Sequence, residues 1–191
     1  AAAHLDLDLS PVVERTAYGA RFSLRLGPAF TRWYHLPLAY LTQRRRLDQF
    51  LAEHAAEAGA QFHDGEAVRA VAVENGRVSV ATDKGRYTAR VLAGADGANG
   101  IVGRSTGTRP RADMAVALEG NLPLAGRLSP RWQEVVALDV GGLPGGYGWI
   151  FPKGNHLNLG VGGWRQCAPY LRAKLAALCR RHGLRTLAIR A

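Results

Sequence analysis

The stretch from Val91 to Arg104 constrains this chain most; it reads Val-Leu-Ala-Gly-Ala-Asp-Gly-Ala-Asn-Gly-Ile-Val-Gly-Arg. The apolar run at positions 91–93 predicts a buried strand, and the glycines after it bracket one acid, Asp96. We therefore expect a strand, a tight turn and the start of a helix. Glycines let such a turn approach another group closely, and the first amides of a helix point towards anions. The stretch is thus consistent with anion or diphosphate binding, and equally with an ordinary turn that closes a strand.

A helix is predicted from Arg44 to a stop signal at Gly59, because apolar residues recur there at helical spacing. Its first residues form the pattern Arg-x-x-Leu-Asp. A cation at the start of a helix is unfavourable to the helix dipole unless an anion lies near it. Arg44 is therefore either an anion ligand or a solvated member of the run Arg44-Arg45-Arg46.

A three-stranded meander is predicted between this helix and the glycine turn. Positions 68–74 and 77–82 alternate around Asn75-Gly76, which is a favoured two-residue hairpin loop. A third strand is expected from 86 to 93 and leads directly into the turn. We therefore expect Asp96 to face a site at the carboxyl end of a strand.

Most of the remaining chain follows the two-residue period of strands. Positions 1–42 predict short strands and loops. Beyond these, glycine and proline separate four expected strands, which we assign to an antiparallel sheet, at 115–120, 134–140, 147–151 and 157–161. The segment 166–182 predicts a helix that ends at Gly183. Its apolar stripe consists of Leu171, Leu175, Leu178 and Cys179.

One expected strand carries three large aromatic residues on one face. Tyr147, Trp149 and Phe151 share that face by the two-residue period, and Pro152 ends the strand. Such a face is either the wall of an apolar cavity or part of a core. Because glycines thin the backbone just before it, we interpret it as a cavity wall.

The composition fits one large or two small folded domains, since 47% of the residues are hydrophobic. The 25 Lys and Arg residues exceed the 15 Asp and Glu residues, which gives a net charge of +10. Most of these cations are isolated in the sequence and do not alternate with aromatic residues. We therefore expect no nucleic-acid partner.

Cys167 and Cys179 are the two cysteines of the chain. In one helix they would lie roughly 18 Å apart at about 1.5 Å per residue, so we expect no bridge between them and a reducing compartment. The sequence shows no secretory signal and no long apolar span. This favours a cytoplasmic location and leaves peripheral membrane contact open.

Three motifs in this order resemble the geranylgeranyl reductase family, which consists of FAD-dependent oxidoreductases of the p-hydroxybenzoate hydroxylase fold. They are Gln43-Arg44-Arg45-Arg46-Leu47-Asp48-Gln49-Phe50-Leu51 followed by Gly59-Ala60, then Gly94-Ala95-Asp96-Gly97-Ala98-Asn99, then Tyr147-Gly148-Trp149-Ile150-Phe151-Pro152-Lys153.

The resemblance implies a mixed α/β fold with part of a Rossmann-like FAD-binding domain, a β-meander and an antiparallel substrate sheet. In domain terms, it implies substrate-domain strands and loops at 1–42, part of the FAD-binding domain at 43–107, the substrate sheet at 108–165, and a helix and tail at 166–191.

The resemblance also implies the residues of the site. Asp96 and Gly97 would belong to the FAD site, and Arg44 would approach the FAD diphosphate and ribose. A paired, partly desolvated arginine against a diphosphate accounts for the position of Arg44 at a helix start. The isoprenoid cavity would be lined by Tyr147, Trp149, Phe151 and Pro152.

The sequence departs from the family pattern at two kinds of position. Gly100 stands where Ser is usual, which removes a hydroxyl that can cap a helix or contact phosphate. The Gly-x-Gly-x-x-Gly turn and the later Gly-Asp motif are absent, and the nearest match to the turn, at 160–165, has Arg165 in place of the third glycine. Together with the missing initiator Met, this leads us to expect an internal piece of a longer protein or the product of a truncated gene.

Three functions follow as hypotheses. The first is an FAD-dependent reductase that saturates C=C bonds of a polyprenyl or other apolar substrate, with NAD(P)H or another donor as reductant. The second is an FAD-dependent aromatic monooxygenase or halogenase-like flavoprotein. The third is a non-catalytic truncated chain or basic binding module. We assign no metal site, no oligomeric state and no catalytic acid or base, although Tyr147 is a candidate because of its place in the cavity motif.

Overall fold

The computed structural model describes residues 7–107, 114–124, 126 and 128–184. The chain divides into two compact units, one formed by Ala1–Glu53 with Asp113–Ala191 and the other by His54–Ala112. The boundary at position 53 falls within the helix α1 (Arg44–Glu57), which begins and ends close to the predicted positions. The first unit contains the main sheet, and the second contains the meander and the glycine turn.

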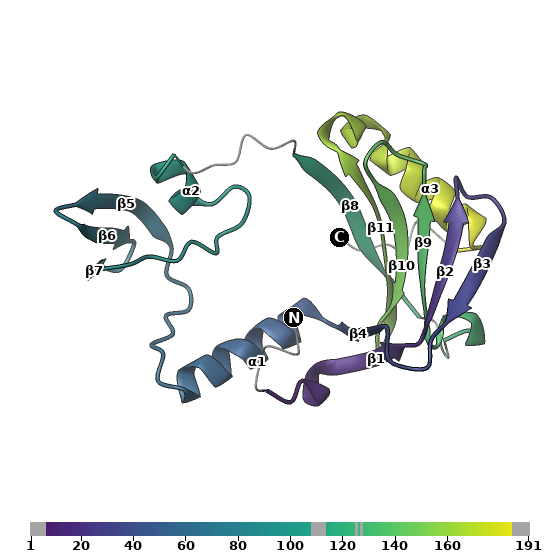
Figure 1. Cartoon of the computed structure of the whole chain (residues 1–191), viewed down its shortest axis with the longest axis horizontal. Coiled ribbons are helices and arrows are strands. Elements are labelled where there is room, and N and C mark those ends of the chain that lie inside the picture. The colour runs from purple at the N-terminus through teal and green to yellow at the C-terminus, as the bar shows by residue number, and fades with distance from the viewer. Residues whose placement is uncertain (1–6, 108–113, 125, 127, 185–191) are drawn as a thin grey trace. The chain divides into compact units, whose positions relative to one another are not determined.

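The main sheet of the first unit has six strands in the order β3-β2-β9-β10-β11-β8 (Figure 1). Their bounds are β2 (Gly19–Leu24), β3 (Ala29–Trp33), β8 (Ala115–Pro123), β9 (Val135–Val140), β10 (Tyr147–Pro152) and β11 (His156–Trp164). The four strands expected beyond residue 114 are confirmed. These four strands pair antiparallel with one another, as expected, and β2 from the N-terminal segment adds a parallel pair with β9. A parallel pair needs a long connection, which the intervening chain supplies.

The helix α3 (Leu171–Arg181) packs against one face of this sheet (Figure 1). All four residues of its predicted stripe are buried, together with Ile150 and Leu159 from the strands beneath. The preceding 3-10 segment, η4 (Arg165–Tyr170), replaces the first part of the expected helix. It contains Pro169, which lacks the N–H that an α-helical bond requires. Cys167 and Cys179 are both buried and free, which confirms that they do not bridge.

A two-stranded ribbon, β1 (Val13–Ala17) with β4 (Ala39–Thr42), packs against the main sheet. Ala17 and Leu41 of the ribbon form a small core with Ala20 and Val136 of the sheet. Phe151 is partly buried against this cluster. The short 3-10 segments η2 (Ser10–Val12) and η3 (Pro130–Trp132) complete the first unit.

The second unit contains the predicted meander, with β5 (Val68–Glu74), β6 (Arg77–Thr82) and β7 (Arg86–Ala89), and the short helix α2 (Ile101–Ser105). Asn75 and Gly76 have φ angles of 51° and 72°, as a tight hairpin loop with the twist of its strands requires. The strand expected at 91–93 is wrong. Val91 is 80% exposed, since this segment finds no pairing strand among the described residues.

The described helices carry no strongly apolar long segment. No residue of α1 is fully buried in the part of the chain that the structure describes, and Leu47, Phe50 and Leu51 of its predicted apolar stripe are half-buried. Over the same residues, every helix falls short of the length and apolar character needed to cross a bilayer.

Candidate functional site

Arg44, the predicted diphosphate ligand, opens α1 with its side chain 84% exposed. Its guanidinium binds the Asp48 carboxylate one turn further along, through Nε at 3.1 Å and an Nη atom at 3.2 Å. The hydrogen bond that Arg44 donates to Asp48 raises the pKa of Arg44, so the group stays charged. Asp48 thus supplies the negative charge that a cation at a helix start needs, and the guanidinium remains accessible to an external anion.

A buried carboxylate, that of Glu14, fixes the start of α1, and sequence analysis did not identify it. The side chain of Glu14 is 6% exposed and accepts hydrogen bonds from Gln43 at 2.6 Å, from Arg46 at 3.3 Å and from the Gly154 amide at 2.9 Å. It therefore joins the helix start to the turn between β10 and β11. No local sequence pattern points to Glu14, because it stands in an ordinary alternating strand and its hydrogen-bond partners are distant in sequence.

The three consecutive arginines consequently have different surroundings. Arg46 is tied to Glu14 and to the Pro11 carbonyl at 2.9 Å. Arg44 is tied only to its own helix, and Arg45 is exposed without a hydrogen bond or ion pair to any residue that the structure describes. Arg44 and Arg46 are both exposed and paired with an acid, and the side chain of Arg44 is the more exposed of the two, at 84% against 52%.

Asp96, the predicted cofactor residue of the glycine turn, lies exposed before α2. Its carboxylate accepts a hydrogen bond from the Val102 amide at 3.1 Å, and this bond is the main reason that the pKa of Asp96 is lowered. The expectation that the opening amides of this helix point at an external anion is therefore wrong for Val102. The anion at that amide is the chain's own Asp96, which caps the helix.

Two glycines of the turn are explained by this cap. Gly97 has a φ of +75°, a conformation that other residues rarely adopt. A side chain at Gly100 would overlap the Asp96 carboxylate. The Gly100 that replaces the expected Ser therefore leaves room for Asp96 to perform the capping that a serine hydroxyl was expected to offer.

The aromatic residues of β10 form a continuous strip on the face of the main sheet opposite α3. The ring centroids of Tyr147 and Trp149 lie 5.8 Å apart, and those of Trp149 and Phe151 lie 6.4 Å apart. Tyr147 is 48% exposed, whereas Trp149 and Phe151 are half-buried. By register, Leu138 of β9 and Phe22 of β2 lie on the same face. We call these five residues the aromatic face.

Two asparagines that the sequence did not point to hold Trp149 in place. The indole Nε1 donates to the Asn158 side-chain oxygen at 2.8 Å, and the Asn158 amide donates to the Asn121 side chain at 3.1 Å. The polar edge of Trp149 is thus satisfied within the sheet. Its ring remains available as an apolar surface with a fixed orientation.

Pro152 does not share the aromatic face. It alternates with Phe151 along β10, so it lies on the α3 side of the sheet with Ile150, and it is almost completely buried. The structure therefore brings together three of the four predicted substrate residues on one face and places the fourth in the core beneath the opposite face.

The chemistry of the predicted cofactor residues fits FAD. Arg44 presents accessible guanidinium donors suited to a diphosphate, and Asp96 is an exposed carboxylate, held ionised, that can accept a hydrogen bond from a ribose hydroxyl. Arg44 belongs to the first unit and Asp96 to the second. The nearest sequence match to a dinucleotide turn, at 160–165, begins in the middle of β11 and is not a turn before a helix.

A family model described as the FAD binding domain matches residues 15–135 of this chain. Digeranylgeranylglycerophospholipid reductase 1 of Methanopyrus kandleri is 32% identical over 131 residues, which are 64% of this chain and 35% of the relative. The chain thus spans about a third of the length of such relatives. The family match confirms the FAD cofactor expected from the motifs, and the relative confirms the resemblance to geranylgeranyl reductases.

Solved structures agree on the fold. A geranylgeranyl bacteriochlorophyll reductase-like protein of Thermoplasma acidophilum superposes with a TM-score of 0.72 at 22% identity, over 95% of this chain and 49% of that chain. The halogenase PltM superposes with a TM-score of 0.65 at 16% identity, over 90% of this chain and 40% of that chain. At these identities the likenesses show a shared fold, and the mixed α/β architecture predicted from the sequence is confirmed.

Proposed function

Because the chain belongs to the FAD binding domain family, we propose that it is part of an FAD-dependent oxidoreductase that saturates C=C bonds of a polyprenyl substrate. The observation that carries this proposal is the aromatic face, an ordered apolar strip with one end exposed. The name of the Methanopyrus kandleri relative supports a polyprenyl lipid as the substrate class.

The residues of the chain have separate tasks in this proposal. Trp149 and Phe151 bind the apolar chain by contact with their rings, and Asn158 keeps the Trp149 ring in one orientation. Arg44 holds the diphosphate of the cofactor, and Asp96 with Gly97 holds a ribose. Bound FAD, once reduced, supplies the hydride.

Tyr147 is the proposed proton donor at the exposed end of the aromatic face. Its hydroxyl makes no hydrogen bond to any residue in the described part of the chain, so it is available to a bound substrate. A phenol can deliver the proton that completes saturation of a double bond after hydride addition.

The proposal also keeps the domain boundaries expected at 42, 107 and 165. It includes peripheral contact of the protein with a membrane that holds the lipid substrate.

The experiment is a reduction assay with the purified chain, dithionite-reduced FAD and geranylgeranyl diphosphate as the probe substrate. We expect products that carry one added dihydrogen per reduced bond by mass spectrometry. Trp149→Ala should lower the rate strongly. The matched control is Trp33→Ala, because Trp33 is an exposed indole on the opposite face of β3.

The same assay distinguishes the other hypotheses. Oxygen uptake coupled to an aromatic substrate, without reduction of the polyprenyl chain, would favour the monooxygenase. Failure of the chain to bind FAD or to convert either substrate would favour a non-catalytic module.

A further inference from the structure

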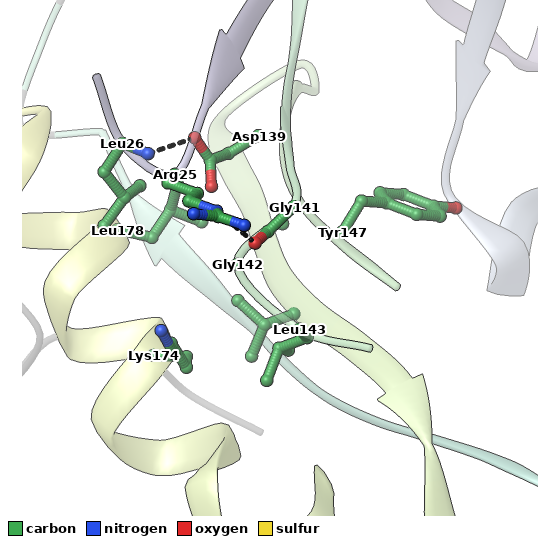
Figure 2. A pocket seen from close by; sticks show the side chains of 11 residues that line it. Arg25, Leu26, Asp139, Gly141, Gly142, Leu143, Tyr147, Lys174 and Leu178 are labelled. Atoms are coloured by element: carbon green, nitrogen blue, oxygen red, sulfur yellow. Dashed lines mark hydrogen bonds between the residues drawn. The ribbon is translucent and has the colours of Figure 1, made fainter. Parts of the chain in front are cut away.

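A pocket of about 230 Å³ lies on the α3 side of the main sheet (Figure 2). The turn between β2 and β3, the loop between β9 and β10, and α3 enclose it. Four apolar side chains line it, Leu26, Leu143, Val161 and Leu178. Although the backbone of Tyr147 borders this pocket, its ring points away (Figure 2). The pocket is therefore separate from the aromatic face.

Two cations from different elements line the pocket, Arg25 from the β2–β3 turn and Lys174 from α3 (Figure 2). Arg25 uses its Nε to donate to the Gly141 carbonyl at 3.2 Å, which leaves its terminal nitrogens for another acceptor. Lys174 forms no hydrogen bond or ion pair with any residue that the structure describes. An apolar pocket that presents unused donors of two cations suits an anion with an apolar part.

The turn that carries Arg25 is held in an uncommon conformation. Arg25 and Leu26 have φ angles of 51° and 60°, which non-glycine residues adopt at a cost. Asp139 accepts a hydrogen bond from the Leu26 amide at 2.6 Å, and Arg181 donates to the Leu26 carbonyl at 2.8 Å. Bonds from both the sheet and α3 therefore fix the turn that presents Arg25 to the pocket.

Asp139 is the one acid that lines the pocket, and its charge is engaged. The same oxygen that binds Leu26 also accepts from the Ser23 hydroxyl at 2.6 Å. Asp139 is also the last acidic residue of the chain, so every charged residue after it is a cation.

Further cations gather around the C-terminal end of α3, close to His182. The pKa of His182 is lowered, first by burial and then by Arg131, Arg21 and Arg181, whose combined effect exceeds the opposing effect of Asp139. The resulting positive field attracts anions towards the pocket.

We propose that this pocket binds the phosphate group of an amphiphile, with Arg25 and Lys174 on the phosphate and the leucine-lined wall on the apolar part. The same chemistry describes a free alkyl phosphate and the headgroup of an anionic phospholipid. The site lies on the face of the sheet opposite the aromatic face, so its failure would leave the proposed function untouched.

The test is a calorimetric titration of the purified chain with octyl phosphate, with octanol and inorganic phosphate as partial probes. The double variant Arg25→Gln, Lys174→Gln should bind octyl phosphate at least roughly tenfold more weakly, because it loses two charge-assisted contacts. Arg172→Gln is the control, since it removes the same charge from α3 at an exposed position that does not line the pocket. Near-ultraviolet circular dichroism would verify that each variant is folded.

Each outcome decides the proposal. Loss confined to the double variant supports it, and flotation with phosphatidic acid vesicles but not phosphatidylcholine vesicles then identifies a lipid headgroup as the source. If octyl phosphate binds but these vesicles do not, the source is a soluble phosphate ester. Equal binding by the double variant and the unaltered chain, equal loss in Arg172→Gln, or no binding by the unaltered chain would overturn it.

Discussion

The six-membered ring of Trp149 on β10 occupies the space above Gly160 on β11 where any side chain would stand. The two residues pair directly in the antiparallel register, and the Trp149 indole donates to Asn158 two residues before Gly160. The Trp149 ring can therefore lie against β11 only because Gly160 has no side chain. Gly160 stood out in the sequence only as part of an imperfect dinucleotide motif, and the structure gives it this packing role.

Replacing Gly160 with alanine should therefore destabilise the first unit by about 1–3 kcal/mol, because the added methyl overlaps the indole. Urea denaturation followed by tryptophan fluorescence would measure the change. In a Trp149→Leu background the same replacement should cost clearly less, because the overlap is relieved. Equal costs in the two backgrounds would show that the ring does not require this glycine.

The Glu14 carboxylate should be a strong stabiliser of the link between α1 and the β10–β11 turn. Glu14→Gln retains the shape but removes the charge that Arg46 and Gln43 face, so the free energy of unfolding should fall by about 1.5–3 kcal/mol. Glu53→Gln is a suitable control, because Glu53 is exposed and bonded only within α1, and its effect should stay within about 0.5 kcal/mol. Similar denaturation midpoints for both variants would contradict this role.

Arg44 and Arg45 provide a matched pair for testing cofactor contact. Arg44→Gln should weaken FAD binding to the purified chain by roughly tenfold, because a charge-assisted contact to the diphosphate is lost. Arg45→Gln removes the same charge one residue away and should leave the affinity unchanged. Flavin fluorescence titration measures both, and equal affinities for the two variants would remove Arg44 from the cofactor site.

His182 should make the first unit less stable in mild acid. Burial and the neighbouring arginines lower its pKa from 6.5 to about 4, so the unfolded chain binds a proton more readily than the folded chain between these values. The free energy of unfolding should therefore decrease as the pH falls from 6.5 towards 4, and it should decrease less in His182→Gln. NMR titration of the imidazole checks the cause directly, and a folded-state pKa near 6.5 would contradict it.

Local patterns in the sequence were sufficient to predict most elements. The Asn75-Gly76 hairpin loop, the α3 stripe that ends at Gly183, and the alternation of Tyr147, Trp149 and Phe151 all appear in the structure as predicted. Each depends on residues within a few positions of one another. Backbone geometry couples such neighbours directly, so their spacing is readable without knowledge of the rest of the chain.

The tertiary structure alone decided the features that join distant segments. It paired β2 with β9 in parallel, placed Glu14 between Gln43 and Gly154, and assembled the pocket from Arg25, Asp139 and Lys174. It also left 91–93 outside any sheet, although their apolar run is typical of a buried strand. A strand or a buried charge is stable only when a partner elsewhere in the chain satisfies it, and local periodicity does not identify that partner.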